Sequence, residues 1–156
     1  MSQYIFTEDL DERKIEGVTL IFITSYIPTH PSNIIINKSI ESILNINYPF
    51  YETIVSYQHN PQEIEDSNKY NEYKILMKKQ YPNFKHLYMD SHGHFIGSIY
   101  NSLCNCKTKY FFLVQHDIEL LGDFPIDKII NYNFDWNIIA SNHLKNGIVK
   151  TTHWYP

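Results

Sequence analysis

The chain has 156 residues, enough for one domain in which roughly 70% of the unfolded surface is buried. Its composition is 43% hydrophobic and 19% charged, which excludes a disordered tail and a coiled coil. Thirteen Lys and Arg against 17 Asp and Glu give a net charge of −4, so the basic face of a nucleic-acid-binding protein is not expected. We therefore expect one globular domain over residues 1–156, with a polar lead-in over 1–16.

The cysteine content and the hydropathy pattern bear on localisation. Cys104 and Cys106 are too few for a disulfide framework, and this favours free thiols in a reducing compartment. Residues 1–14 are polar and lack the apolar stretch of a secretion signal. Because no apolar run approaches the roughly 20 residues of a membrane span, we expect a cytoplasmic protein without one.

Apolar, β-branched runs predict the strands. The predicted strands are 18–27, 52–57, 84–89 and 109–114, with further short ones at 137–141 and 147–151. Between them, apolar residues recur at helical spacing over 33–47, around residue 73, over 95–104 and over 126–131. The second helix is expected to bury Tyr70, Tyr73, Leu76 and Met77, and the third Ile96, Ile99, Tyr100 and Leu103.

Strands that alternate with helices indicate a three-layer, Rossmann-like α/β fold, with a mostly parallel sheet and helices on both faces. Ligands of such sheets bind outside the carboxyl ends of the strands. The segments that leave the four main strands are 28–30, 58–60, 90–94 and 115–119. Five of the eight histidines lie in these segments, so the sequence predicts that polar chemistry gathers at one edge of the sheet.

Asp117 is the strongest candidate for a ligand-binding residue. A carboxylate at the end of a buried strand must be solvated, paired or bound to metal. In extended chain, Gln115, Asp117 and Glu119 point to one side, where two carboxylates could bind Mg²⁺ or Mn²⁺. The alternative is an aspartate that only caps the turn after the strand.

Other chemistries have weaker signals. His92, His94 and His116 could together bind zinc, although loop histidines are commonly just solvated. No glycine-rich dinucleotide fingerprint, Walker sequence or Gly-x-Ser-x-Gly elbow occurs in the chain. Dehydrogenase, NTPase and serine hydrolase activities are therefore not expected.

The order of several short motifs resembles the nucleotide-sugar-binding half of family 2 glycosyltransferases, which have the GT-A fold. The matching pieces are Ile27-Pro28-Thr29-His30, Ser42-Ile43, Tyr48-Pro49, 52–55, Asn101, Tyr110 and 111–117. They cover about residues 17–122, and 123–156 would be a short remnant of the acceptor half. The resemblance implies a glycosyltransferase that uses a nucleotide-diphosphate sugar donor and a divalent metal.

The resemblance also implies roles for individual residues. Asp117 would bind Mn²⁺ or Mg²⁺ as the last position of the family's Asp-x-Asp pattern, in which Gln115 replaces the first Asp. The nucleotide-sugar-binding residues would be Pro28, Thr29, His30, Tyr57, Gln58, Asn101, Gln115 and His116. Tyr57 and Gln58 replace the acidic pair that reads the base in the family, which leaves the base preference open.

The catalytic base does not follow from the resemblance. No acidic motif of the family occurs after Asp117, and Asp135 and Glu119 are the candidates. Two alternatives stay open: a non-catalytic nucleotide-sugar or carbohydrate-binding module derived from such an enzyme, and a metal-dependent hydrolase that uses His92, His94, His116 and Asp117. The acceptor could be a glycan, a protein or a lipid.

Overall fold

The computed structural model describes residues 15–25, 33–91, 93–120, 125–131, 143–145 and 148–150. The chain divides into two compact units, Met1–Phe124 and Pro125–Pro156. The elements of the first unit are β1 (Ile15–Thr24), α1 (Asn33–Leu44), β2 (Glu52–Tyr57), α2 (Ile64–Gln80), β3 (Lys85–Tyr88), α3 (His94–Asn105) and β4 (Thr108–Gln115). The second contains α4 (Ile126–Ile130), β5 (His143–Lys145) and β6 (Ile148–Lys150).

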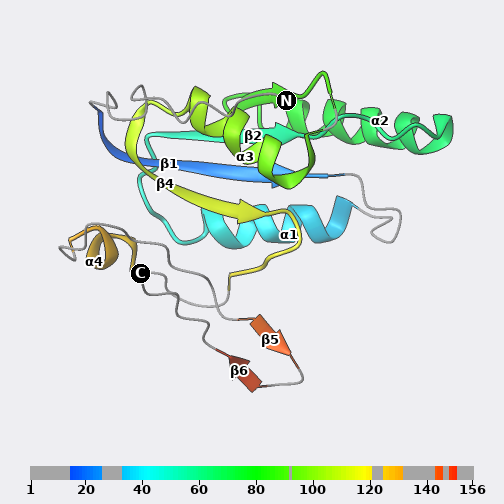
Figure 1. The fold of residues 1–156 in the computed structure, drawn as a ribbon. Helices are drawn as coiled ribbons and strands as arrows, with labels where there is room; N and C mark the ends of the chain where they lie inside the picture. Colours follow the sequence, from blue (N-terminus) through cyan, green and yellow to red (C-terminus); the bar gives the residue numbers. More distant parts are fainter. Residues whose placement is uncertain are drawn as a thin grey trace. The chain divides into compact units, whose positions relative to one another are not determined.

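The four strands of the first unit form one parallel sheet in the order β3-β2-β1-β4 (Figure 1). Each parallel neighbour is reached through a helix, as the geometry of such crossovers requires. The α/β fold with a parallel sheet that the sequence predicts is thereby confirmed.

Alternation along the strands gives the sheet two apolar faces. Leu20 and Phe22 of β1 pack in one cluster, whereas Ile21 and Ile23 pack in another, because successive side chains point to opposite faces. The first cluster takes in residues of α1 and α2, and the second packs against α3. Figure 1 shows α1 and α3 on opposite sides of the sheet. The helices therefore cover both faces, as expected.

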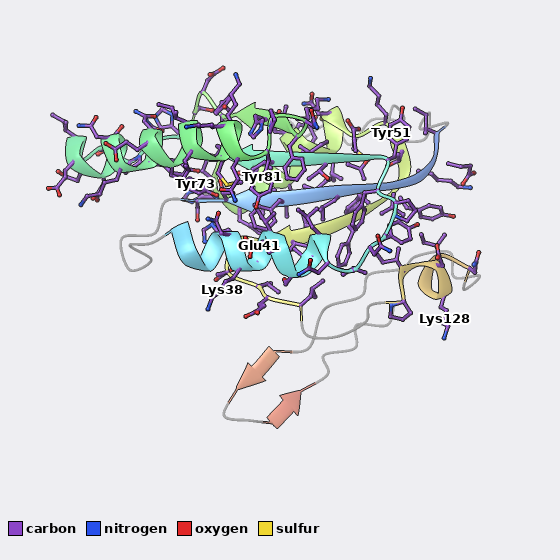
Figure 2. The ribbon with its side chains drawn as sticks, turned by 180° about the vertical axis from the view of Figure 1, so that it is seen from behind. Lys38, Glu41, Tyr51, Tyr73, Tyr81 and Lys128 are labelled. Atoms are coloured by element: carbon purple, nitrogen blue, oxygen red, sulfur yellow. The ribbon has the colours of Figure 1, made fainter. Side chains whose placement is uncertain are left out.

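The helices α1 and α2 share one face of the sheet. Tyr73 of α2 and Tyr81, which follows α2, belong to the apolar cluster that also contains residues of α1, and Figure 2 labels both tyrosines and Glu41 of α1. Burial, and secondarily the nearby Glu41 carboxylate, raise the pKa of the Tyr81 hydroxyl. Of the expected inward residues, Leu76 is 39% exposed, because it lies one position and so about 100° around the helix from buried Met77.

The helix α3 buries part of the predicted stripe, because Ile99 and Leu103 pack against the sheet as expected. Ile96 is 75% exposed and Tyr100 is 52% exposed, so the expectation that they point inward is wrong. The buried side of the helix is made of Phe95, Ser98, Ile99, Ser102 and Leu103. Small serines let the helix lie close to the sheet, and the Ser102 hydroxyl is satisfied because it donates to the Ser98 carbonyl at 2.7 Å.

The strand boundaries differ modestly from the predicted ones. The strand β1 begins at Ile15, three residues earlier than expected, and its register with β4 shifts between Ile15 and Val18. Gly17 adopts a φ of 137° at this irregularity, which only glycine adopts without strain. The predicted strand 137–141 lies outside the described residues.

In the second unit, β6 falls within the strand expected at 147–151, and β5, which the sequence did not predict, pairs with it antiparallel. The short helix expected over 126–131 is found as α4. No helix in the described part of the chain has the length and apolar character needed to cross a membrane.

Candidate functional site at the carboxyl edge of the sheet

The carboxyl ends of the four parallel strands meet at one edge of the sheet. Thr24 lies opposite Tyr57, Tyr57 opposite Tyr88, and Ile23 opposite Gln115. The chain that leaves each strand therefore starts from this edge, as the sequence predicts. Pro28, Thr29 and His30, which follow β1, lie outside the described residues.

His116 ties the ends of β1 and β4 together. Its backbone N–H donates to the Ile23 carbonyl at 3.0 Å, and its ring Nδ1 accepts from the Ser25 N–H at 2.9 Å. Because Nδ1 accepts, the neutral ring carries its proton on Nε2. With only 5% of its surface exposed, His116 holds the site's backbone in place, which differs from the direct nucleotide contact expected of it.

Asp117 follows this anchor directly and is exposed. The turn is closed by the Ile118 N–H, which donates to the Gln115 carbonyl at 3.3 Å, and Gln115 itself is half-buried. Further along, the Leu120 N–H donates to the Ser42 hydroxyl of α1 at 3.0 Å. The Asp117 carboxylate is thus presented to solvent from a segment that is fastened on both sides.

The donors near Asp117 determine which cation could bind. In the described residues there is no group of three or more His, Cys, Asp and Glu side chains able to enclose a metal. One or two carboxylates, however, suffice for Mg²⁺ when phosphate oxygens of a ligand complete its coordination. The turn at 116–117 ends the extended chain in which Asp117 and Glu119 were expected to point to one side. Asp117 is therefore the exposed carboxylate that could take part in such a shared site.

Two predicted ligand-binding residues have other positions. Tyr57 is fully buried, its ring stacked on Tyr88 at a centroid distance of 5.1 Å, so it belongs to the core and not to a ligand-contacting surface. Asn101 lies about two turns into α3, roughly 10 Å from the start of that helix at the carboxyl edge. Gln58 stays at the edge, where its N–H lies 3.1 Å from the Tyr70 hydroxyl and 3.3 Å from the Thr24 carbonyl.

The described histidines of the proposed zinc site differ in exposure and in hydrogen bonding. His94 begins α3, is exposed, and has a φ of 51°. His116 has its Nδ1 engaged by Ser25, as described above. His92 lies outside the described residues, as does the candidate base Asp135. As predicted, Cys104 and Cys106 are free thiols; Cys104 is exposed and Cys106 is buried.

An open cleft of about 830 Å³ occupies the other half of the edge, beside the ends of β2 and β3. It is lined by residues after those strands and by one side of α2: His59, Asn60, Asn71, Lys74, Ile75, Lys78, Tyr88, Met89 and Asp90. Asn60 organises its polar part, because its Nδ2 donates to the Ser67 hydroxyl and to Asn71 Oδ1, both at 2.9 Å, while its Oδ1 accepts from the Lys74 ammonium.

Lys74 is the half-buried cation of this cleft. Its ammonium lies 4.3 Å from the centre of the Tyr70 ring and 5.9 Å from that of Tyr88. Burial lowers the pKa of Lys74, since no carboxylate of the described residues pairs with it. Sequence reasoning missed Lys74 and Tyr88. Lys74 and Lys78 lie four positions apart on a predicted helix, and this spacing is the signal that could have identified Lys74.

The comparisons with known proteins add no assignment: no family model matches the chain, and no curated protein matches it either.

Proposed function

We propose that the chain binds a nucleotide-diphosphate sugar at the carboxyl edge of its sheet and transfers the sugar to an acceptor hydroxyl. The observation that carries the proposal is the exposed Asp117 carboxylate, placed directly after His116, which is hydrogen-bonded to the end of β1. A parallel sheet with such a carboxylate at its ligand-binding edge is the arrangement the resemblance to family 2 glycosyltransferases implies.

Each residue has a defined part in this proposal. Asp117 would hold Mg²⁺ or Mn²⁺ together with the diphosphate, and the ion would stabilise the charge of the departing diphosphate. His116 positions Asp117 by fixing the turn to β1, and Gln58 offers an amide at the end of β2 for polar groups of the nucleoside.

The reaction breaks the bond between the anomeric carbon and the diphosphate oxygen and forms one from that carbon to the acceptor oxygen. The acceptor proton passes to a carboxylate that acts as general base. Glu119 is exposed two residues after Asp117 and is the described candidate for this role. Asp135 is the other candidate.

Ligand-dependent thermal stability tests the binding step, because a ligand of the native state raises the melting temperature by mass action. The wild-type chain should be stabilised by UDP or GDP, or by their sugars, more strongly when Mn²⁺ is present. Asp117→Asn should abolish the metal-dependent part. Glu72→Gln, which removes one exposed carboxylate of α2, should leave it intact. If Asp117→Asn keeps the full metal-dependent shift, Asp117 does not hold the metal.

Hydrolysis or transfer of the donor sugar tests the chemical step. Release of the nucleoside diphosphate from a stabilising donor, lost in Glu119→Gln or in an Asp135 variant, would identify the base. A chain that is stabilised by donors but never releases the diphosphate, with any acceptor class, would be a nucleotide-sugar-binding module without transfer activity.

A further inference from the structure

The cleft beside β2, β3 and α2 contains more positive than negative charge. Lys74 and Lys78 lie one helical turn apart on α2, and both line the cleft. The lining contains a single carboxylate, Asp90, and among the described residues neither lysine forms an ion pair with it. The cationic side of the cleft is therefore available to a ligand.

Lys74 is the residue for which a bound anion would change most. A partly buried ammonium loses hydration that a neutral amide and two aromatic rings replace only in part. Asn60 and the Tyr70 ring supply those interactions here. An anion in the cleft would provide the missing counter-charge through a charge-assisted hydrogen bond.

The rest of the lining suits a sugar ring. Tyr88 is 45% exposed, and stacking on Tyr57 holds its ring in place. Aromatic rings bury the apolar face of a ligand at low cost in side-chain freedom. Asn60 and Asn71 are fixed by their mutual hydrogen bond and bring amide groups next to the two lysines, where sugar hydroxyl groups could bond to them.

We infer that this cleft binds an acidic carbohydrate, a sugar that carries a phosphate or a carboxylate, with the anion at Lys74 and Lys78 and the sugar ring against Tyr88. The site is separate from Asp117 and stands on the cleft alone, so it does not depend on the function proposed above. If the chain does transfer a sugar, the cleft defines the charge of a second substrate.

Calorimetric titration of the full chain tests the inference, with glucose phosphate, glucuronate, uncharged glucose and inorganic phosphate as the probes. The charged sugars should bind about tenfold or more tightly than glucose, as one charge-assisted hydrogen bond predicts. They should also bind more tightly than inorganic phosphate, which lacks the ring, and their affinity should fall as salt is added.

Two neighbouring lysines of α2 provide a matched pair of variants. Lys78→Gln should weaken binding of the charged sugars several-fold, whereas Lys79→Gln, the same change one residue away and outside the cleft lining, should leave it within about twofold. Lys74→Met should weaken binding by about tenfold or more. Since Lys74→Met also removes the bond to Asn60, its fold is checked by circular dichroism, and Lys78→Gln decides if it does not fold.

Several results would overturn the inference. Equal weakening by Lys78→Gln and Lys79→Gln would indicate general attraction to the helix surface and no built site. Equal affinity for glucose and the charged sugars would exclude the anion subsite, and equal affinity for inorganic phosphate and glucose phosphate would exclude the ring subsite. Because Asp117→Asn should leave these titrations unchanged, failure here is distinguishable from failure of the nucleotide-sugar proposal.

Discussion

The two halves of the carboxyl edge use their polar side chains in different ways. In the β1–β4 half, the buried His116 ring bonds the Ser25 N–H, and the exposed Asp117 comes directly after it. In the β2–β3 half, Lys74 lies half-buried in an open cleft without a carboxylate partner among the described residues. One half is fastened by a satisfied polar group, and the other keeps a charge that a ligand could neutralise. A buried polar group with a hydrogen-bond partner fixes the backbone around it, whereas a half-buried cation that lacks a carboxylate partner can still gain from binding an anion.

Alkaline pH should have the largest effect on the free energy of unfolding, because it ionises the buried tyrosines of the β2–β3 half of the edge. Burial raises the pKa of Tyr57, Tyr70 and Tyr73, that of Tyr70 from 10.0 to about 12. Because the folded-state values are raised, this stabilisation is fully present below about pH 10 and is lost as the pH rises through the folded-state values. The rise in the pKa of Tyr70 alone corresponds to roughly 3 kcal/mol in the free energy of unfolding.

The free energy of unfolding, measured in denaturant at a series of alkaline pH values, should therefore fall steeply above pH 10. Tyr70→Phe, which cannot titrate, should make the fall less steep. A free energy of unfolding that stays constant well above pH 10 would show that these hydroxyls are not buried as described.

Substitutions of Tyr57 test how much the stability of the β2–β3 half depends on its buried ring. Tyr57→Ala removes a fully buried ring that stacks on Tyr88 and His86, and should destabilise the chain by about 3–5 kcal/mol. Tyr57→Phe loses only the hydroxyl, which lies 2.9 Å from His86 Nδ1, and should cost about 1 kcal/mol. Denaturant unfolding of both variants measures the difference. A small effect of Tyr57→Ala would instead place the ring at the surface, where it could contact a ligand.

Substitution of His116 tests the β1–β4 half of the edge. His116→Ala leaves the Ser25 N–H without its partner and empties the ring's volume, so we expect a loss of about 2 kcal/mol in the free energy of unfolding. Asp117→Asn, at the neighbouring exposed position, should change stability by less than about 0.5 kcal/mol. Equal stability of the two variants in denaturant would contradict the division between an anchor and an exposed ligand-binding residue.

Tyr73 provides the smallest effect, of opposite sign. Its hydroxyl is buried, and no hydrogen-bond partner for it is found among the described residues. Tyr73→Phe should therefore leave stability unchanged or raise it by up to about 1 kcal/mol, in contrast to Tyr57→Phe. Parallel unfolding curves of the two Phe variants compare them directly. A loss of stability in Tyr73→Phe would mean that its hydroxyl is bonded after all.

The two central strands of the sheet could be predicted because β1 and β2 are buried over most of their length and so contain continuous apolar runs. The strand at 52–57 was predicted with the bounds that β2 has. The buried side of α3 was predicted only in part, with Ile99 and Leu103, because counting apolar residues also selects Ile96 and Tyr100 and overlooks Ser98 and Ser102. A serine whose hydroxyl bonds a carbonyl of its own helix is compatible with burial, and hydropathy does not record this.

The sequence by itself determined the alternation of strands and helices, and with it the parallel sheet and the edge at which its polar segments meet. This follows because connection length and apolar periodicity leave few ways to form a covered sheet. Only the tertiary structure decided the surroundings of these two polar side chains. His116 bonds to the Ser25 N–H, 91 positions before it, and Lys74 lies between Asn60 and the rings of Tyr70 and Tyr88. The bond between His116 and Ser25 joins residues far apart in the chain, and no local pattern in the sequence specifies it.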